Sequence, residues 1–164
     1  FTNASQAVLL HLLEQYKRMQ STPLSSWAKS RWIDMAHTAE WLIDNADVSP
    51  DNQTTLLALV ALLHNQGEDW DGWFEAIPGT SNHNVNVAQG LKSAAVFSRY
   101  NSSAVYANFT MEQLSLRRMQ KLDGTYGQPT GMYLGDEITP VPYTRSPSRG
   151  IETCGVVEAM YSYE

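Results

Sequence analysis

Apolar side chains recur every three or four residues along most of this 164-residue chain. Such spacing gathers them on one face of a helix, because an α-helix has about 3.6 residues per turn. No segment shows the alternation of a strand between hairpin turns. The stripes cover residues 8–19, 32–43, 56–63, 87–95, 106–122 and 156–161. The sequence therefore predicts an all-α protein of helices joined by turns.

Two connections between these stripes are unusually long. They run from Gly67 to Asn82 and from Asp123 to Gly150, and the second is rich in proline and glycine. Loops of this length are uncommon unless they are functional or disordered. The helix between Ser49-Pro50 and Gly67 has clear ends, because Ser is a good N-cap, Pro suits the first helical position and Gly favours a stop.

The overall charge and the asparagine motifs limit the class of protein. A net charge of -6 argues against a nucleic-acid-binding protein, and no apolar run approaches the roughly 18 residues that span a bilayer. Four glycosylation sequons begin at Asn3, Asn52, Asn101 and Asn108. Cys154 is the single cysteine, which excludes an intrachain disulfide. We predict a secreted glycoprotein; the alternative is a cytosolic chain in which the four motifs are coincidental.

The two ends of the chain suggest a portion of a larger domain. Phe1 has the character of an internal or processed start. The last helix begins near Ile151 and carries apolar residues almost to Glu164, without a stop signal. We expect residues 1–164 to form part of a single domain that continues beyond Glu164.

Acids and the thiol gather in the C-terminal third. Asp136 and Glu137 lie in the second long connection, and adjacent carboxylates favour the protonated form of a general acid when both are desolvated. Glu152 and Cys154 lie at the start of the last helix, where the helix dipole favours a thiolate and both groups could bind zinc. The alternatives are a solvated loop acid at Glu137 and a buried, inert thiol at Cys154.

Histidines and tryptophans offer further candidates. His83 precedes the helix of residues 87–95 and could cap that helix or reach into a site. The other histidines (His11, His37 and His64) lie within predicted helices, where surface or core roles are expected. The segment Asp69–Phe74 is predicted to be an aromatic loop whose tryptophans stack on a sugar or fill a core. A calcium loop is discounted there, because the later ligands are missing.

Three motifs together resemble glycoside hydrolase family 127, the β-L-arabinofuranosidase-like proteins. They are His83-Asn84-Val85-Asn86-Val87-Ala88-Gln89-Gly90-Leu91-Lys92, Gly127-Gln128-Pro129-Thr130-Gly131-Met132 with Gly135-Asp136-Glu137, and Gly150-Ile151-Glu152-Thr153-Cys154. The likeness is clearest over residues 82–164 and looser before them, in Arg31–Met35 and Leu62–Gly67.

The resemblance implies a portion of an (α/α) toroid of paired helices and a retaining glycosidase that acts on furanosides. It implies that Glu137 is the acid/base, with Asp136 as the alternative. It also implies that Glu152 and Cys154 are zinc ligands and that His83 contacts the carbohydrate substrate. In the family a zinc-bound cysteine thiolate attacks the sugar.

The chain departs from the family in one respect. The nucleophilic cysteine and a neighbouring cysteine ligand of the family come from a later segment, and this sequence has no other Cys. Either a companion fragment or a remaining C-terminal segment supplies them, or catalysis has been lost. The second hypothesis is therefore a non-catalytic structural or carbohydrate-binding glycoprotein that retains the fold.

Overall fold

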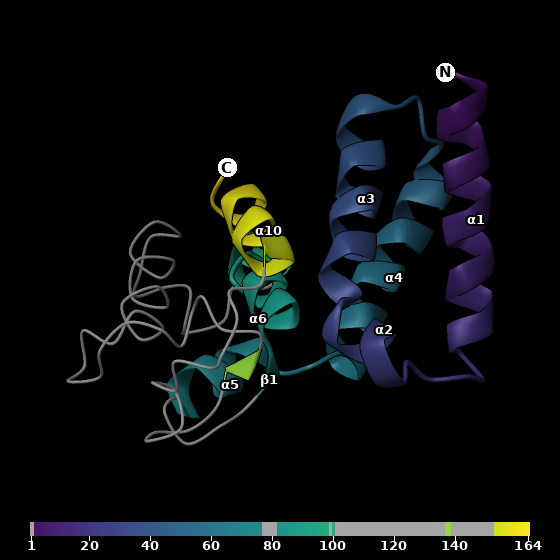
Figure 1. Cartoon of the computed structure of the whole chain (residues 1–164). Coiled ribbons are helices and arrows are strands. Elements are labelled where there is room, and N and C mark those ends of the chain that lie inside the picture. Colours follow the sequence, from purple (N-terminus) through teal and green to yellow (C-terminus); the bar gives the residue numbers. More distant parts are fainter. Residues whose placement is uncertain (1, 77–81, 99, 101–136, 139–152) are drawn as a thin grey trace. The chain divides into compact units, whose positions relative to one another are not determined.

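The computed structural model describes residues 2–76, 82–98, 100, 137–138 and 153–164 (Figure 1). The chain divides into two compact units, Phe1–Glu68 with Arg99–Asn101 and Asp69–Ser98 with Ser102–Glu164. Most of the described residues are helical, which confirms the predicted all-α class. The expectation that residues 1–164 belong to one domain stays a prediction.

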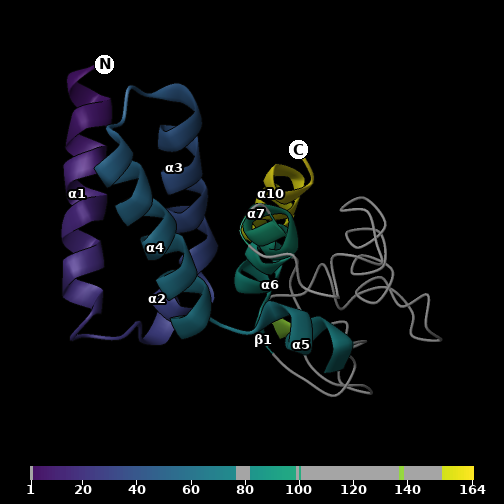
Figure 2. The same cartoon turned by 180° about the vertical axis from the view of Figure 1, so that it is seen from behind.

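Three long helices make up the core of the first unit. They are α1 (Asn3–Met19), α3 (Trp32–Asn45) and α4 (Pro50–Gln66), and a short helix, α2 (Ser26–Ser30), precedes α3. The three long helices pack against one another, as both views show (Figures 1 and 2). Their predicted apolar stripes meet inside, where the buried side chains include Leu9, Leu12, Ile33, Ala36, Leu42, Leu56, Leu59, Val60 and Leu63. The helical periodicity predicted these three helices but not α2.

Local hydrogen bonds set the ends of these helices. Ser49 caps α4 by accepting a hydrogen bond from the backbone N–H of Asn52 (3.4 Å), as the Ser-Pro pair predicts. Gln66 lies at the other end of α4. Its side-chain amide donates to the carbonyl of Met19 (3.2 Å) and accepts from the N–H of Leu24 (3.0 Å). Gln66 therefore ties the end of α1 and the connection that follows it to α4.

The second unit holds shorter elements. They are α5 (Trp70–Ala76), β1 (Asn82–His83), α6 (Asn84–Gly90), α7 (Ser93–Ser98), β2 (Glu137–Ile138) and α10 (Thr153–Tyr163). Strands β1 and β2 form an antiparallel pair, and α10 packs against α6. Strands of two residues are too short to produce an alternating pattern, so the sequence did not predict them. The helix predicted over residues 87–95 is two helices, which separate at Leu91 and Lys92.

The predicted aromatic loop at residues 69–74 is wrong, because the chain forms α5 there. The Asp69 carboxylate accepts a hydrogen bond from the N–H of Gly72 (3.0 Å) and so caps this helix. Trp70, Trp73 and Phe74 are buried, with ring centroids 5.3–6.2 Å apart. These aromatic side chains form core, and Asp69 is a helix cap.

Several predictions fall outside the described residues. They include the helix of residues 106–122, most of the connection between Asp123 and Gly150, and the sequons at Asn101 and Asn108. Within the described ranges, no helix is long and apolar enough to cross a membrane.

Candidate functional site

The antiparallel pairing of β1 with β2 brings two predicted site residues together. His83 lies directly opposite Glu137 in the register, and Asn82 lies opposite Ile138. Opposite positions of an antiparallel pair lie on the same face, about 4.5–5.5 Å apart at Cβ. His83 and Glu137 are more than fifty residues apart in the sequence, so it is the fold that brings them next to each other. The predicted substrate-contacting residue and the predicted acid/base thus share one register position.

Helices α6 and α10 bring a third predicted residue to the same unit. α6 begins at Asn84, immediately after His83, and α10 begins at Thr153, immediately before Cys154. Gly155 packs closely against the side-chain amide of Asn84, so the first turns of the two helices touch. Cys154 is exposed beside this contact. The alternative of a buried thiol is therefore wrong.

Several polar side chains on α6 and just after it are buried, although residues of these types usually lie on the surface. They are Asn84, Asn86, Gln89, Lys92 and Ser93. The side chain of Asn82 organises the start of the helix, because its Oδ1 accepts from the N–H of His83 (2.8 Å) and from Nδ2 of Asn86 (3.3 Å). Buried polar groups are costly unless they are hydrogen-bonded. Asn86 and Lys92 have side-chain partners in Asn82 and Glu158, whereas the Asn84 amide makes no hydrogen bond.

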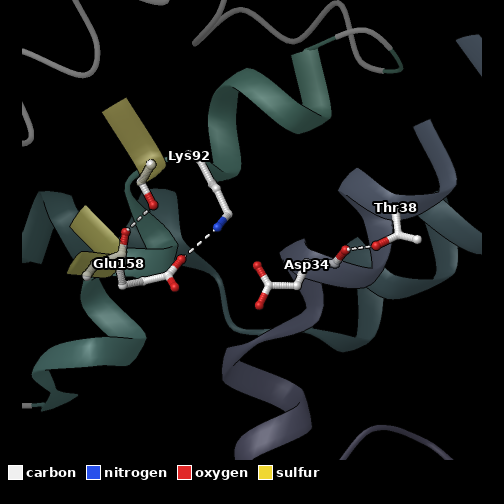
Figure 3. Close-up of polar contacts among 6 residues, drawn as sticks. Asp34, Thr38, Lys92 and Glu158 are labelled. Carbon is white, nitrogen blue, oxygen red and sulfur yellow. Dashed lines mark hydrogen bonds and ion pairs between the residues drawn. The ribbon is translucent and has the colours of Figure 1, made fainter. Parts of the chain in front are cut away.

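An ion pair holds α10 to the turn after α6. Figure 3 shows the Lys92 ammonium pointing at the Glu158 carboxylate. Nζ lies 2.7 Å from Oε1 of Glu158 and 4.3 Å from the centre of the Tyr161 ring. The hydroxyl of Ser162 donates to the carbonyl of Ala88 (2.8 Å). Glu158 lies one helical turn after Cys154, so this contact also sets the position of the thiol along α6. Figure 3 also shows a local bond within α3, from the Thr38 hydroxyl to the Asp34 carbonyl (2.7 Å).

The predicted zinc site stays a prediction. Glu152 lies outside the described residues, as does Asp136, the alternative acid. Among the residues that the structure describes, no group of three or more His, Cys, Asp or Glu side chains could hold a metal ion. A structural zinc takes four ligands, and of the two that were predicted only Cys154 is described. The described residues alone therefore do not fit a zinc ion.

The remaining sequence predictions concern histidines and sequons. His11 is exposed and His37 is half-buried, while His64 packs edge-on against Trp32 with ring centroids 5.4 Å apart. Asn3 is exposed in the first turn of α1, and Asn52 is half-buried in the first turn of α4. The histidines therefore have the surface or core roles that were expected, and the use of the sequons stays a prediction.

Sequence reasoning missed Asn84 and the other buried polar residues of α6. Asn82, Asn86, Gln89 and Ser93 recur at helical spacing, opposite the apolar positions. That pattern normally indicates the solvent face of an amphipathic helix. Here α6 is buried on nearly all sides, so the polar face also points inward.

Comparison with models of protein families, with curated proteins and with solved structures found no match to this chain.

Proposed function

We propose that this chain is part of a secreted, retaining glycoside hydrolase that acts on furanosides such as β-L-arabinofuranosides. Its helices would be a portion of an (α/α) toroid. The observation that carries the proposal is the β1–β2 register, in which His83 lies opposite Glu137. A glycosidase needs a proton donor and a sugar-binding group at one place. The register supplies both residue types together.

Glu137 is the acid/base of the proposed reaction. In the first step its carboxylic acid protonates the leaving glycosidic oxygen, and in the second step its carboxylate takes a proton from water. His83 binds a hydroxyl of the sugar and holds the ring against Glu137. The family resemblance and the register support this pair independently, because the resemblance concerns sequence and the register concerns backbone pairing.

The surroundings of His83 support a carbohydrate ligand. Sugars present many hydroxyls, and a site that binds them needs fixed polar side chains kept away from bulk water. The α6 segment, which begins directly after His83, has polar side chains that are buried.

The proposed reaction also needs a nucleophile and a metal ion. A zinc ion would activate a thiolate at neutral pH, and Cys154 with Glu152 are the residues of this chain that would help to hold it. The attacking cysteine of the proposed enzyme belongs to sequence other than these 164 residues. A companion fragment or a further segment is therefore part of the proposal.

The decisive experiment measures hydrolysis of p-nitrophenyl β-L-arabinofuranoside by the complete native protein. Glu137→Gln should lower the rate by about 10²–10⁴-fold. Added azide should restore turnover of this activated substrate and give a glycosyl azide of retained configuration, because azide needs no general base. Glu164→Gln, the same change at an exposed acid, should leave the rate unchanged. Full activity of Glu137→Gln would contradict the assigned role.

A non-catalytic carbohydrate-binding glycoprotein is the other outcome of this experiment. It predicts sugar binding without hydrolysis in the native protein. Treatment with a peptide:N-glycosidase tests the secreted location separately. A fall in mass, with Asn converted to Asp at any of the sequons at Asn3, Asn52, Asn101 and Asn108, would support it. Four unmodified asparagines in material from the natural source would count against it.

A further inference from the structure

One fully buried side chain on α6 has no hydrogen-bond partner. Asn84 is completely excluded from solvent, and neither its Oδ1 nor its Nδ2 makes a hydrogen bond. A buried amide in this state is unfavourable, and an apolar side chain of the same size would stabilise the fold more. Partner-less buried polar groups are rare in native proteins and need a specific explanation.

The amide lies at the first turn of α10. The atoms nearest to the position of a β-carbon on Gly155 all belong to the Asn84 amide. Because Gly155 has no side chain, this amide can lie directly over the helix backbone. The first N–H groups of a helix lack intrahelical acceptors, and α10, with 11 residues, is a helix of ordinary length. Thr153 and Cys154 are exposed, so solvent reaches the residues beside the contact.

The chemistry of this place favours a neutral ligand with neighbouring hydroxyls. An amide offers one acceptor and two donors, and each hydroxyl of a diol can both donate and accept. A helix N-terminus also attracts anions. However, the cation of this segment, Lys92, is already paired with Glu158, and an acidic residue, Glu137, lies opposite His83 in the register. An added negative charge would therefore be less well stabilised than a diol.

We propose that Asn84 is a specificity-determining residue whose side-chain amide binds two adjacent hydroxyls of a furanoside at the N-terminus of α10. The choice of sugar rests on the proposed function. The amide oxygen accepts from one hydroxyl, and the amide nitrogen donates to the next. Both polar atoms of Asn84 are then satisfied only when the ligand is bound.

The test combines ligand discrimination with stability. Binding of methyl β-L-arabinofuranoside and of its 2-deoxy and 3-deoxy analogues is measured by calorimetry, on a Glu137→Gln background that prevents hydrolysis. The reference protein should bind the parent glycoside about tenfold more tightly than one or both analogues. Asn84→Leu should bind all three within about twofold of one another. Its melting temperature should equal or exceed that of the reference, because the substitution removes an unpartnered amide.

Asn86→Leu is the matched control. Asn86 is a buried asparagine of the same helix, but its Nδ2 already donates to Asn82. This change should lower the melting temperature and preserve the discrimination among the three sugars. The pair of variants therefore separates a ligand-binding amide from a structural one.

Three results would overturn the proposal. Asn84→Leu could fold and retain the discrimination, it could fold but melt well below the reference, or sulfate at low concentration could bind instead of the sugar in an Asn84-dependent way. If Asn84→Leu does not fold, Asn84→Asp provides the second variant, since it keeps the shape and removes the donors; undiminished discrimination there has the same meaning. If the native protein discriminates among the sugars but does not hydrolyse them, the proposed glycosidase activity is contradicted and the role of Asn84 is not. If it hydrolyses them without discrimination, the role of Asn84 is contradicted and the glycosidase activity is not.

Discussion

The ammonium of Lys92 and the carboxylate of Glu158 form a 2.7 Å ion pair between the turn after α6 and the middle of α10. The Lys92 side chain is 6% exposed and that of Glu158 is 20% exposed, so water screens this pair only weakly. The pair joins two segments that are 66 residues apart in the sequence. It is therefore a tertiary contact that holds the Cys154 end of α10 against α6.

Removing the cation should destabilise the second unit. Lys92→Met leaves the Glu158 carboxylate largely buried without its partner, and we expect a loss of about 2–3 kcal/mol in the free energy of unfolding. The double variant Lys92→Met/Glu158→Met should lose less, because no unpaired charge remains. Urea denaturation followed by tryptophan fluorescence measures both. Lys29→Met, at an exposed lysine, serves as the control, and equal losses in the single and double variants would contradict the ion-pair explanation.

Gly90 should tolerate no side chain. A β-carbon at Gly90 would lie 2.5–3.0 Å from three atoms of the buried Trp70 indole, which is rigid and enclosed. Gly90→Ala should therefore cost about 1–2 kcal/mol, despite the better helix propensity of Ala. Gly72→Ala is the matched control, because its crowded neighbour is the exposed Asp69 carboxylate, which can move. Thermal unfolding of the two variants should differ clearly, and similar melting temperatures would show that Trp70 adjusts.

Gln66 should stabilise the first unit through its two hydrogen bonds. Gln66→Met keeps the length of the side chain but removes the bonds to Met19 and Leu24, with an expected loss of about 1–2 kcal/mol. Gln20→Met removes only a long, exposed bond of 3.5 Å to Tyr16 and should change stability by less than about 0.5 kcal/mol. Chemical denaturation of both variants provides the comparison. A Gln66→Met protein as stable as the parent would mean that water replaces the lost bonds.

The thiol of Cys154 should react in the folded protein. Because the residue is exposed, a disulfide reagent such as 5,5′-dithiobis(2-nitrobenzoate) should modify it without denaturant, at a rate that low urea concentrations do not change. For the 164-residue chain, which has a single cysteine, Cys154→Ser provides the blank. Reaction that begins only at the unfolding transition would show that the thiol is protected in the native state.

Local sequence signals predicted part of this architecture. The helical stripes located α1, α3 and α4, and Ser49-Pro50 and Gly67 marked the ends of α4, because caps and periodicity act over one or two turns. The same signals failed over residues 69–76. There the sequence pattern predicts a loop, but the chain forms α5, with the Asp69 side chain as its cap and the Trp70 ring packed against Gly90.

The candidate site, too, could be predicted from the sequence only in part. The types and order of its residues were visible along the chain: a histidine before a helix, an acid in a proline-rich connection and a thiol at a helix start. Which of them become neighbours depends on backbone pairing and helix packing across more than fifty residues, and no periodicity within a segment records that. By itself the sequence determined the helical class, the main helix boundaries and the candidate chemistry. Only the tertiary structure decided that His83 lies opposite Glu137, that Asn84 is buried against Gly155 and that the polar face of α6 points inward, because these relationships depend on long-range packing.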